Sequence, residues 1–298
     1  MMAADRARAQ GELRWHEPMC RHTSLRVGGP AERFYKPASL EDLSAFLAQL
    51  DHDTPVFWFG LGSNLLVRDG GLPGVVVATG GVFMMLENAG SHCIEAGASV
   101  ACTQLARQAI RWGYGPSEFF AGIPGTLGGA LAMNAGAHGG ETWDRVRGVT
   151  TIDRHGTVHE RSPAEYEIGY RHVQGPPDEW FVGASLAFDA AADASMATLQ
   201  AMLARRKDTQ PLGLPSCGSV FRNPPGEHAA RLIESAGLKG YRVGGAEVSE
   251  KHANFIINRG NASAADIEAL IAHVQQAVRA RHGVELLHEV RIVGREAT

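Results

Sequence analysis

The residues with the clearest chemical potential are two glycine-rich segments that could bind phosphate. The first is GLGSNLLVRD, Gly60 to Asp69, which follows an apolar stretch. Glycine lets the backbone approach a ligand closely, and successive N–H groups in such a turn can bind an anion. An ordinary turn is the alternative. The segment is neither a Rossmann fingerprint, because no G-x-G-x-x-G opens a helix here, nor a Walker loop, because no Gly-Lys-Ser or Gly-Lys-Thr ends it.

The second segment is GIPGTLGGALAMNAGAHGGE, Gly122 to Glu141. Its glycines and alanines leave little side-chain bulk, so its backbone could wrap around a flat or extended cofactor. Tight backbone packing between lobes is the alternative. Because a dinucleotide has two phosphates, two loops rich in N–H groups suit it well. The pair of segments therefore favours a dinucleotide cofactor.

Three polar residues elsewhere could act on a substrate. Ser219 lies in SCGSVFRNP, which is not the G-x-S-x-G of a nucleophile elbow, so the sequence alone favours a turn or cap residue. Arg171 follows Tyr170 in a loop-like stretch. Glu289 lies in the apolar segment LLHEV, where a carboxylate needs a partner, a function or a position facing water.

The elements around these residues have the pattern of an α/β protein. Ser39 to Leu50 predicts a helix with a capping box of Ser39 and Asp42, and strands are predicted over Pro55–Phe59 and Val75–Ala78. Further along we expect a helix over 101–112, a hairpin around 154–156 and a strand over 180–188. We place a lobe boundary at 191–195, followed by a helix that ends near 207. The chain then ends with a helix capped by Ser263 and Asp266 and closed by Gly283, and with a strand over 285–294.

Size and composition limit the class of protein. The chain has 298 residues, which predicts two or three lobes, and its net charge of -4 gives no sign of a nucleic-acid partner. Four cysteines form no C-x-x-C pair, and no apolar run has the length of a signal sequence core or a membrane span. These features predict a cytoplasmic protein without metal, membrane or nucleic-acid partners. Residues 1–20 carry no signal that we can interpret.

The segments resemble, in type and in order, the UDP-N-acetylenolpyruvoylglucosamine reductase family. The resemblance covers about residues 20–294 and rests on Thr23 to Gly29, the two glycine-rich segments, Tyr170-Arg171, GSVFRNP, HANFIIN (His252 to Asn258) and EVRIVG. It implies an α+β (mixed α/β) fold: a two-lobed FAD-binding domain of the PCMH/vanillyl-alcohol-oxidase type at 1–190, with lobes of about 1–85 and 86–190, and a C-terminal α/β substrate-binding domain at 191–298. The short interval between Arg171 and Trp180 leaves no room for an extra tyrosine-bearing loop, so the chain resembles the short form of the family.

The resemblance also implies an activity. A cytoplasmic monomer would use FAD and NADPH to reduce UDP-N-acetylglucosamine enolpyruvate to UDP-N-acetylmuramate for peptidoglycan synthesis. Ser219 would protonate the α-carbon, Arg171 and Glu289 would stabilise charge on the carboxylate, and Tyr170 and Asn223 would contact substrate. The residues implied to bind FAD are Gly60, Leu61, Gly62, Ser63, Asn64, Gly122, Ile123, Pro124, Gly125, Thr126, Gly128 and Gly129.

Two positions depart from the family pattern. Val173 stands where a small hydroxyl residue is usual, and His138 where an aromatic residue is common. Two other functions are considered beside the reductase. One is another FAD-dependent oxidase of the same fold, often with a covalently tethered flavin, and the other is a non-catalytic nucleotide-binding protein. Ser219, Arg171 and Glu289 argue against both.

Overall fold

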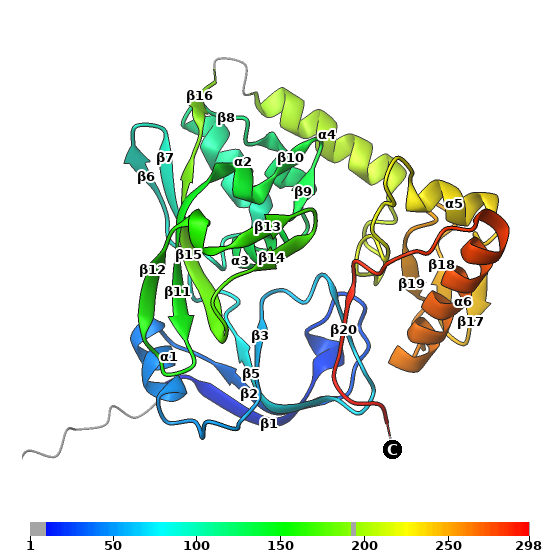
Figure 1. The fold of residues 1–298 in the computed structure, drawn as a ribbon, viewed down its shortest axis with the longest axis horizontal. Coiled ribbons are helices and arrows are strands. Elements are labelled where there is room, and N and C mark those ends of the chain that lie inside the picture. Colours follow the sequence, from blue (N-terminus) through cyan, green and yellow to red (C-terminus); the bar gives the residue numbers. More distant parts are fainter. Residues whose placement is uncertain (1–9, 192–194, 298) are drawn as a thin grey trace, which may run out of the picture. The chain divides into compact units, whose positions relative to one another are not determined.

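The computed structural model describes residues 10–191 and 195–297 (Figure 1). Its chain divides into two compact units. Unit 1 takes the residues up to Arg14, Phe34–Gly60 and Val76–Ala204, and unit 2 takes Trp15–Arg33, Leu61–Val75 and the residues from Arg205 onward. The predicted functional division at residue 190 stays a prediction, and residues 192–194 of the expected boundary lie outside the described residues.

Unit 1 is built on a five-stranded antiparallel sheet in the order β12-β11-β15-β7-β6. Its strands are β6 (Leu86–Gly90), β7 (Cys93–Gly97), β11 (Val146–Asp153), β12 (Val158–Arg161) and β15 (Glu179–Ala187). Helices α2 (Cys102–Arg111) and α3 (Leu127–Met133) supply buried leucines to the core under this sheet. The predicted helix at 101–112, the hairpin with Gly156 at positive φ and the strand at 180–188 are confirmed.

A second sheet of four strands has the order β1-β2-β5-β3, from β1 (Glu12–Pro18), β2 (Pro30–Lys36), β3 (Val56–Phe59) and β5 (Leu72–Ala78). Helix α1 (Leu40–Leu47) begins at Ser39, whose hydroxyl accepts a hydrogen bond from the Asp42 N–H. The Asp42 carboxylate does not return the bond to Ser39. It accepts from the Tyr35 hydroxyl at 2.6 Å and from the Ala38 N–H at 2.8 Å, so only half of the predicted capping box is present.

Strand β1 lies within residues 1–20, for which no element was predicted. Its five leading residues are exposed, including Trp15 at 61%. Its first five residues, Glu12 to His16, do alternate polar and apolar types, as strands often do, but the apolar Leu13 and Trp15 are exposed at 43% and 61% and bury no face. Its place in the sheet rests on backbone pairing with β2.

Unit 2 has its own apolar core around the long helix α6 (Ala264–His282). The predicted capping box of Ser263 and Asp266 is complete, and Gly283 ends the helix with φ 67°. Around α6 lie helix α5 (Ala229–Ser235) and a three-stranded sheet of β17 (Arg242–Val243), β18 (Ala246–Val248) and β19 (Ile256–Asn258). Strand β4 (Leu65–Val67) pairs in parallel with β20 (Arg291–Val293).

The predicted closing strand at 285–294 is mostly wrong, because only β20 within it is a strand. Upstream of β20, the N–H groups of Glu289 and Val290 both donate to the Val220 carbonyl, at 2.7 and 3.2 Å, and Phe221 forms an isolated bridge with His288. Two consecutive donors to one acceptor break the regular ladder. The apolar run therefore bends along the Ser219 segment before it pairs with β4.

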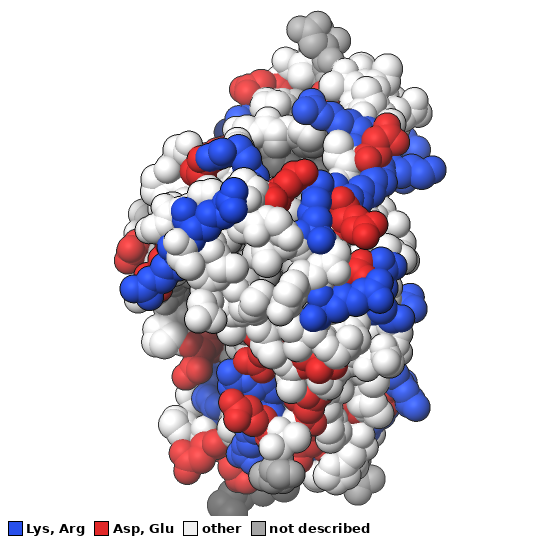
Figure 2. Space-filling view, turned by 90° about the vertical axis from the view of Figure 1, so that its right-hand side faces the viewer, with Lys and Arg blue, Asp and Glu red and all other residues white. Residues whose placement is uncertain are grey.

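The remaining elements are short, apart from the 14-residue helix α4 (Met196–Thr209). The short elements are β8 (Tyr114–Gly115) with β16 (Asp189–Ala190), β9 (Gly136–Ala137) with β10 (Gly140–Glu141), β13 (Glu167–Gly169) with β14 (His172–Gln174), and the 3-10 turns η1 (Met19–Arg21), η2 (Glu118–Gly122), η3 (Thr142–Arg145) and η4 (Pro163–Glu165). All four cysteines are free thiols. No helix among the described residues is long and apolar enough to span a membrane. Basic and acidic side chains are intermixed on the face drawn in Figure 2.

Candidate active site

Arg171 lies at the tip of a tight hairpin in unit 1. Gly169 pairs with His172, so Tyr170 and Arg171 form the two-residue turn between β13 and β14, and Arg171 has φ 54°. Its guanidinium donates to the carbonyls of Asn134 at 3.2 Å and Gly136 at 2.9 Å. The side chain is only 14% exposed, and the Tyr170 ring lies 4.8 Å from its guanidinium carbon. The loop-like stretch of the sequence thus holds a fixed cation.

Asn134 is the buried residue that supports this hairpin. It ends α3 in the left-handed region at φ 42° and is 2% exposed. Its amide nitrogen donates to Gly169 O at 3.1 Å and to Glu141 Oε2 at 2.8 Å, while its amide oxygen accepts from Trp143 N at 3.1 Å. The second half of the Gly122–Glu141 segment therefore anchors Arg171. The sequence predicted a cofactor or tight backbone packing for the whole segment, and named no residue of this half as a support for Arg171.

The first half of that segment lies beside Gly60 in unit 1. A Cβ added at Gly60 would come within 3.2 Å of Thr126 Oγ1, and one added at Gly122 within 2.6 Å of the Ala137 Cβ. Gly125 has φ 132°, which strains any other residue. Gly129 is exposed, so the backbone there is not covered by side chains. Small residues are thus required where the two glycine-rich segments meet.

The rest of the first segment, Leu61 to Asn64, belongs to unit 2. Gly62 has φ 60°, and its carbonyl accepts from both the N–H and the hydroxyl of Ser24, at 3.1 and 3.2 Å. The Asn64 amide donates to the Glu289 carbonyl at 3.1 Å, and the Asn64 carbonyl accepts from Arg291 N–H. The first glycine-rich segment is therefore tied to the backbone of a predicted catalytic residue.

Ser219 and Glu289 come from adjacent segments of unit 2. Glu289 N–H donates to the Val220 carbonyl at 2.7 Å, which places the two segments side by side. The nearby thiol of Cys217 is buried, and this burial raises its pKa to about 12, with the charge of Glu289 adding to the rise. Within the described residues, no hydrogen bond engages the Ser219 hydroxyl. Both predicted residues are half-buried, so a ligand can reach them.

Asn254 is a buried polar residue that fixes the Ser219 segment, and sequence reasoning gave it no role. Its side-chain oxygen accepts from Phe221 N–H at 2.9 Å, its side-chain nitrogen donates to Phe221 O at 2.8 Å, and its carbonyl accepts from Val220 N–H at 2.9 Å. Asparagines within the apolar run HANFIIN were the available signal, because a buried amide must find partners.

The other residues named from the sequence differ in how far they are exposed. Asn223 is exposed, and its side-chain oxygen accepts from Ala229 N–H at 3.1 Å, at the start of α5. Tyr170 is 48% exposed. Val173 lies in β14, partly buried against the core of unit 1. The ring of His138 lies near Gly122, since a Cβ added there would be 3.1 Å from it.

The structure thus brings the predicted residues together in two sets. Unit 1 contains Arg171, Tyr170, Gly60 and the Gly122–Gly129 stretch, whereas unit 2 contains Ser219, Glu289, Asn223 and Leu61–Asn64. The first set offers a fixed guanidinium and a bare backbone. The second offers a hydroxyl and a carboxylate on neighbouring segments.

Comparison with known proteins identifies similar chains over almost the whole length. The family model for an FAD binding domain matches residues 31–162, and that for the C-terminal domain of UDP-N-acetylenolpyruvoylglucosamine reductase matches residues 210–293. Enzymes of that name from Alkalilimnicola ehrlichii and Methylococcus capsulatus are 61% and 57% identical, covering 99% and 98% of this chain and 99% and 97% of their own. The crystal structure of the reductase from Thermus caldophilus has a TM-score of 0.80 and 33% identity, and covers 95% of this chain and 98% of its own.

Proposed function

Because this chain belongs to the UDP-N-acetylenolpyruvoylglucosamine reductase family, we propose that it reduces the enolpyruvyl group of UDP-N-acetylglucosamine enolpyruvate to give UDP-N-acetylmuramate, with NADPH as the reductant. The chain is an FAD-dependent oxidoreductase of peptidoglycan synthesis, with a mixed α/β fold. The observation that carries the finer proposal is the pairing of the Ser219 and Glu289 segments through Val220 in unit 2.

The residues around Gly60 and Gly122 fit the FAD that this proposal requires. Gly129 is exposed and carries no side chain, so the backbone at the start of α3 is open to an approaching cofactor. We assign the cofactor contacts to Gly60–Asn64 and Gly122–Gly129, as the sequence predicts. Bound FAD would supply the redox step, the passage of a hydride from the nicotinamide to the substrate.

Arg171 and Glu289 are assigned to the carboxylate end of the substrate, Arg171 as the positive donor and Glu289 as a hydrogen-bonded acid. When a hydride adds to the β-carbon of the enolpyruvyl double bond, negative charge develops on the α-carbon and its carboxylate. A guanidinium held by two carbonyls stabilises that charge without having to reorganise.

Ser219 is assigned to proton delivery. Its hydroxyl would donate a proton to the α-carbon, which completes the new C–H bond, and water would later restore the hydroxyl proton. A serine is a weak acid, so this step depends on a strongly basic carbon and a site closed to bulk water. The lack of a hydrogen bond to this hydroxyl among described residues leaves the donor available.

Purified protein tests the proposal directly. We expect a yellow protein that oxidises NADPH at a rate that depends on added UDP-N-acetylglucosamine enolpyruvate, and that forms UDP-N-acetylmuramate in equal amount. Acid precipitation should release the flavin into the supernatant. Flavin that stays in the pellet would favour an oxidase with a tethered cofactor, and colourless protein that takes up no FAD would contradict the proposal.

A further inference from the structure

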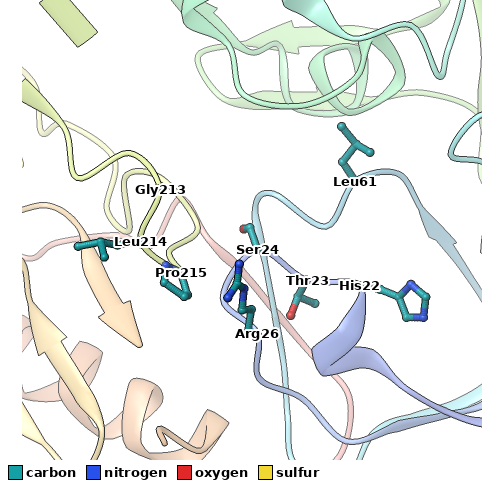
Figure 3. A pocket seen from close by; sticks show the side chains of 8 residues that line it. All are labelled: His22, Thr23, Ser24, Arg26, Leu61, Gly213, Leu214 and Pro215. Carbon is teal, nitrogen blue, oxygen red and sulfur yellow. The ribbon is translucent and has the colours of Figure 1, made fainter. Parts of the chain in front are cut away.

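Two arginines in the described part of the chain have a left-handed backbone, Arg26 with φ 55° and Arg171 with φ 54°. Arg26 lines a cavity of unit 2 with Ser24 and Leu61 (Figure 3), and Leu61 belongs to the segment already assigned to the cofactor. Among the described residues, no carboxylate lines that cavity. Arg171, in contrast, has the carboxylate of Glu141 beside it in unit 1. An acidic neighbour is therefore not a requirement of this backbone conformation, and the position of Glu141 needs its own explanation.

The Glu141 carboxylate lies near the Arg171 guanidinium at a distance too long for a hydrogen bond. Glu141 Oε1 is 3.9 Å from Arg171 Nη1. A direct pair in this protein has a different geometry, since both guanidinium nitrogens that Arg68 uses lie 3.0–3.2 Å from the carboxylate oxygens of Glu268. Glu141 therefore acts on Arg171 through its charge and leaves the hydrogen-bonding fork of the arginine to other acceptors.

Bonds to its own surroundings hold Glu141 at this distance. Its Oε2 accepts from the side-chain amide of Asn134 at 2.8 Å, and its N–H donates to Asp144 Oδ2 at 3.1 Å. Its backbone pairs with Gly136, whose carbonyl accepts from Arg171 at 2.9 Å. The guanidinium and the carboxylate are thus both fixed by the same short piece of chain, so their separation is set before any ligand arrives.

A fixed carboxylate beside the guanidinium opposes the binding of a second carboxylate. Reduction changes the double bond of the enolpyruvyl group but leaves its carboxylate in place, so the proposed substrate and product offer Arg171 the same anion. Attraction that is equally strong before and after the reaction does not speed the chemical step, and strong binding of the product slows its release. The negative charge of Glu141 weakens this attraction for both.

We propose that Glu141 is a positioning residue that acts through Arg171. Its carboxylate offsets part of the guanidinium charge and thereby sets how tightly the carboxylates of substrate and product are held. The inference rests on the proposed function, which assigns the carboxylate end of the substrate to Arg171. Its effect is confined to ligands that carry this carboxylate, so a UDP-sugar without one is bound equally well with and without the charge of Glu141.

Two variants of the full-length, FAD-loaded protein separate the charge of Glu141 from its hydrogen bond. Glu141→Gln removes the charge and keeps an oxygen that can accept from Asn134, whereas Glu141→Asp keeps the charge and shortens the reach. In calorimetry, UDP-N-acetylmuramate should bind Glu141→Gln roughly 3- to 10-fold more tightly than wild type, as expected for the loss of one partly screened like charge. Glu141→Asp should bind it with wild-type affinity. UDP-N-acetylglucosamine, which lacks the carboxylate, should bind all three proteins equally.

Glu165→Gln is the matched control. Glu165 also pairs with an arginine, Arg161 at 3.1 Å, and also belongs to the capping box of a 3-10 turn, where it accepts from Ser162 N–H at 2.8 Å. Its side chain is 40% exposed, close to the 33% of Glu141. Because Glu165 is not paired with Arg171, its replacement should leave the affinity for both UDP-sugars unchanged. Equally tighter binding of UDP-N-acetylmuramate by this control would overturn the specific role of Glu141.

The outcomes separate this inference from the proposed function. Tighter binding of UDP-N-acetylmuramate alone, in Glu141→Gln alone, supports it. Unchanged or weaker binding in Glu141→Gln overturns it, and so does an equal change for both UDP-sugars, which indicates a purely structural role. Tighter binding in Glu141→Asp also overturns it, because that variant keeps the charge. If Glu141→Gln binds the carboxylate ligand more tightly but wild-type protein does not turn over the enolpyruvyl substrate, the reductase assignment fails and the role of Glu141 stands.

Discussion

Arg171 in unit 1 and Ser219 in unit 2 are fixed in opposite ways. The arginine is held by its own side chain, which donates to the carbonyls of Asn134 and Gly136. The serine is held through the backbone of its neighbours, because Val220 and Phe221 bond to Asn254 and Glu289. The described residues engage the guanidinium and leave the serine hydroxyl without a hydrogen bond.

This difference follows from the two proposed tasks. A group that stabilises charge performs best when its dipoles or charge are already in place, so a guanidinium gains from being immobilised. A group that gives up a proton must be able to rotate toward the acceptor, so its backbone is fixed while its hydroxyl is not. The three predictions below remove the serine hydroxyl, change the anchored guanidinium and disturb the backbone bonds of the serine segment, in that order.

The largest effect is expected from Ser219→Ala. Removal of the hydroxyl should slow the second half-reaction, the reduction of the enolpyruvyl sugar, roughly 10²- to 10⁴-fold, as is typical for loss of a general acid. Reduction of the flavin by NADPH should stay at the wild-type rate, because the serine is assigned to the proton and not to the cofactor. Stopped-flow absorbance of the flavin measures both steps.

Ser216→Ala is the matched control for this variant. It removes a hydroxyl three residues away on the same segment, also half-buried, and should leave both half-reactions intact. Equal slowing of both half-reactions in Ser219→Ala would show that the serine supports the cofactor site or the fold, and would remove the contrast with Arg171.

A smaller effect is expected from Arg171→Lys, which keeps the charge but not the planar fork. A lysine nitrogen cannot bond the carbonyls of Asn134 and Gly136 in the same geometry and also reach a carboxylate. We expect the second half-reaction to slow roughly 10- to 100-fold, since one preorganised donor is weakened. Arg107→Lys, on the exposed face of α2, is the control. Wild-type kinetics in Arg171→Lys would mean that a positive charge at this position is enough for the reaction and that the planar guanidinium is not needed.

The sequence predicted the elements whose side chains alternate between core and water. Helix α6, with its capping box and Gly283, and the hairpin at Gly156 followed from periodicity and turn chemistry alone. Strand β1 and the bend before β20 did not, because backbone pairing decides both of them. A pattern of residue types contains no information about which carbonyl a given N–H will reach.

The candidate site shows the same limit. The sequence and the resemblance named Ser219, Arg171 and Glu289 as residues that act on substrate. Their supports, Asn134 and Asn254, are uncharged amides in small-residue or apolar segments. The apolar run around Asn254 indicates that its amide needs partners, but not which ones. Only the fold shows that each amide bonds groups far away in the sequence, as Asn254 does with Phe221.

The smallest kinetic effect is expected from Asn254→Asp. The carboxylate keeps an acceptor for Phe221 N–H but faces the Phe221 carbonyl with oxygen instead of a donor, which should destabilise the protein by about 1–3 kcal/mol. The shifted backbone should slow the second half-reaction roughly tenfold, as expected for a donor misplaced by a fraction of an ångström. Flavin reduction should be unaffected.

Asn258→Asp is a control of the same chemistry, because it places an oxygen against Leu25 O. It should lower the thermal midpoint by a similar amount, while leaving the rate of proton delivery from Ser219 to bound substrate unchanged. If both variants slow that rate equally, the bonds between Asn254 and the Ser219 segment affect the rate only through the stability of the protein. The contrast with the side-chain anchoring of Arg171 then does not hold.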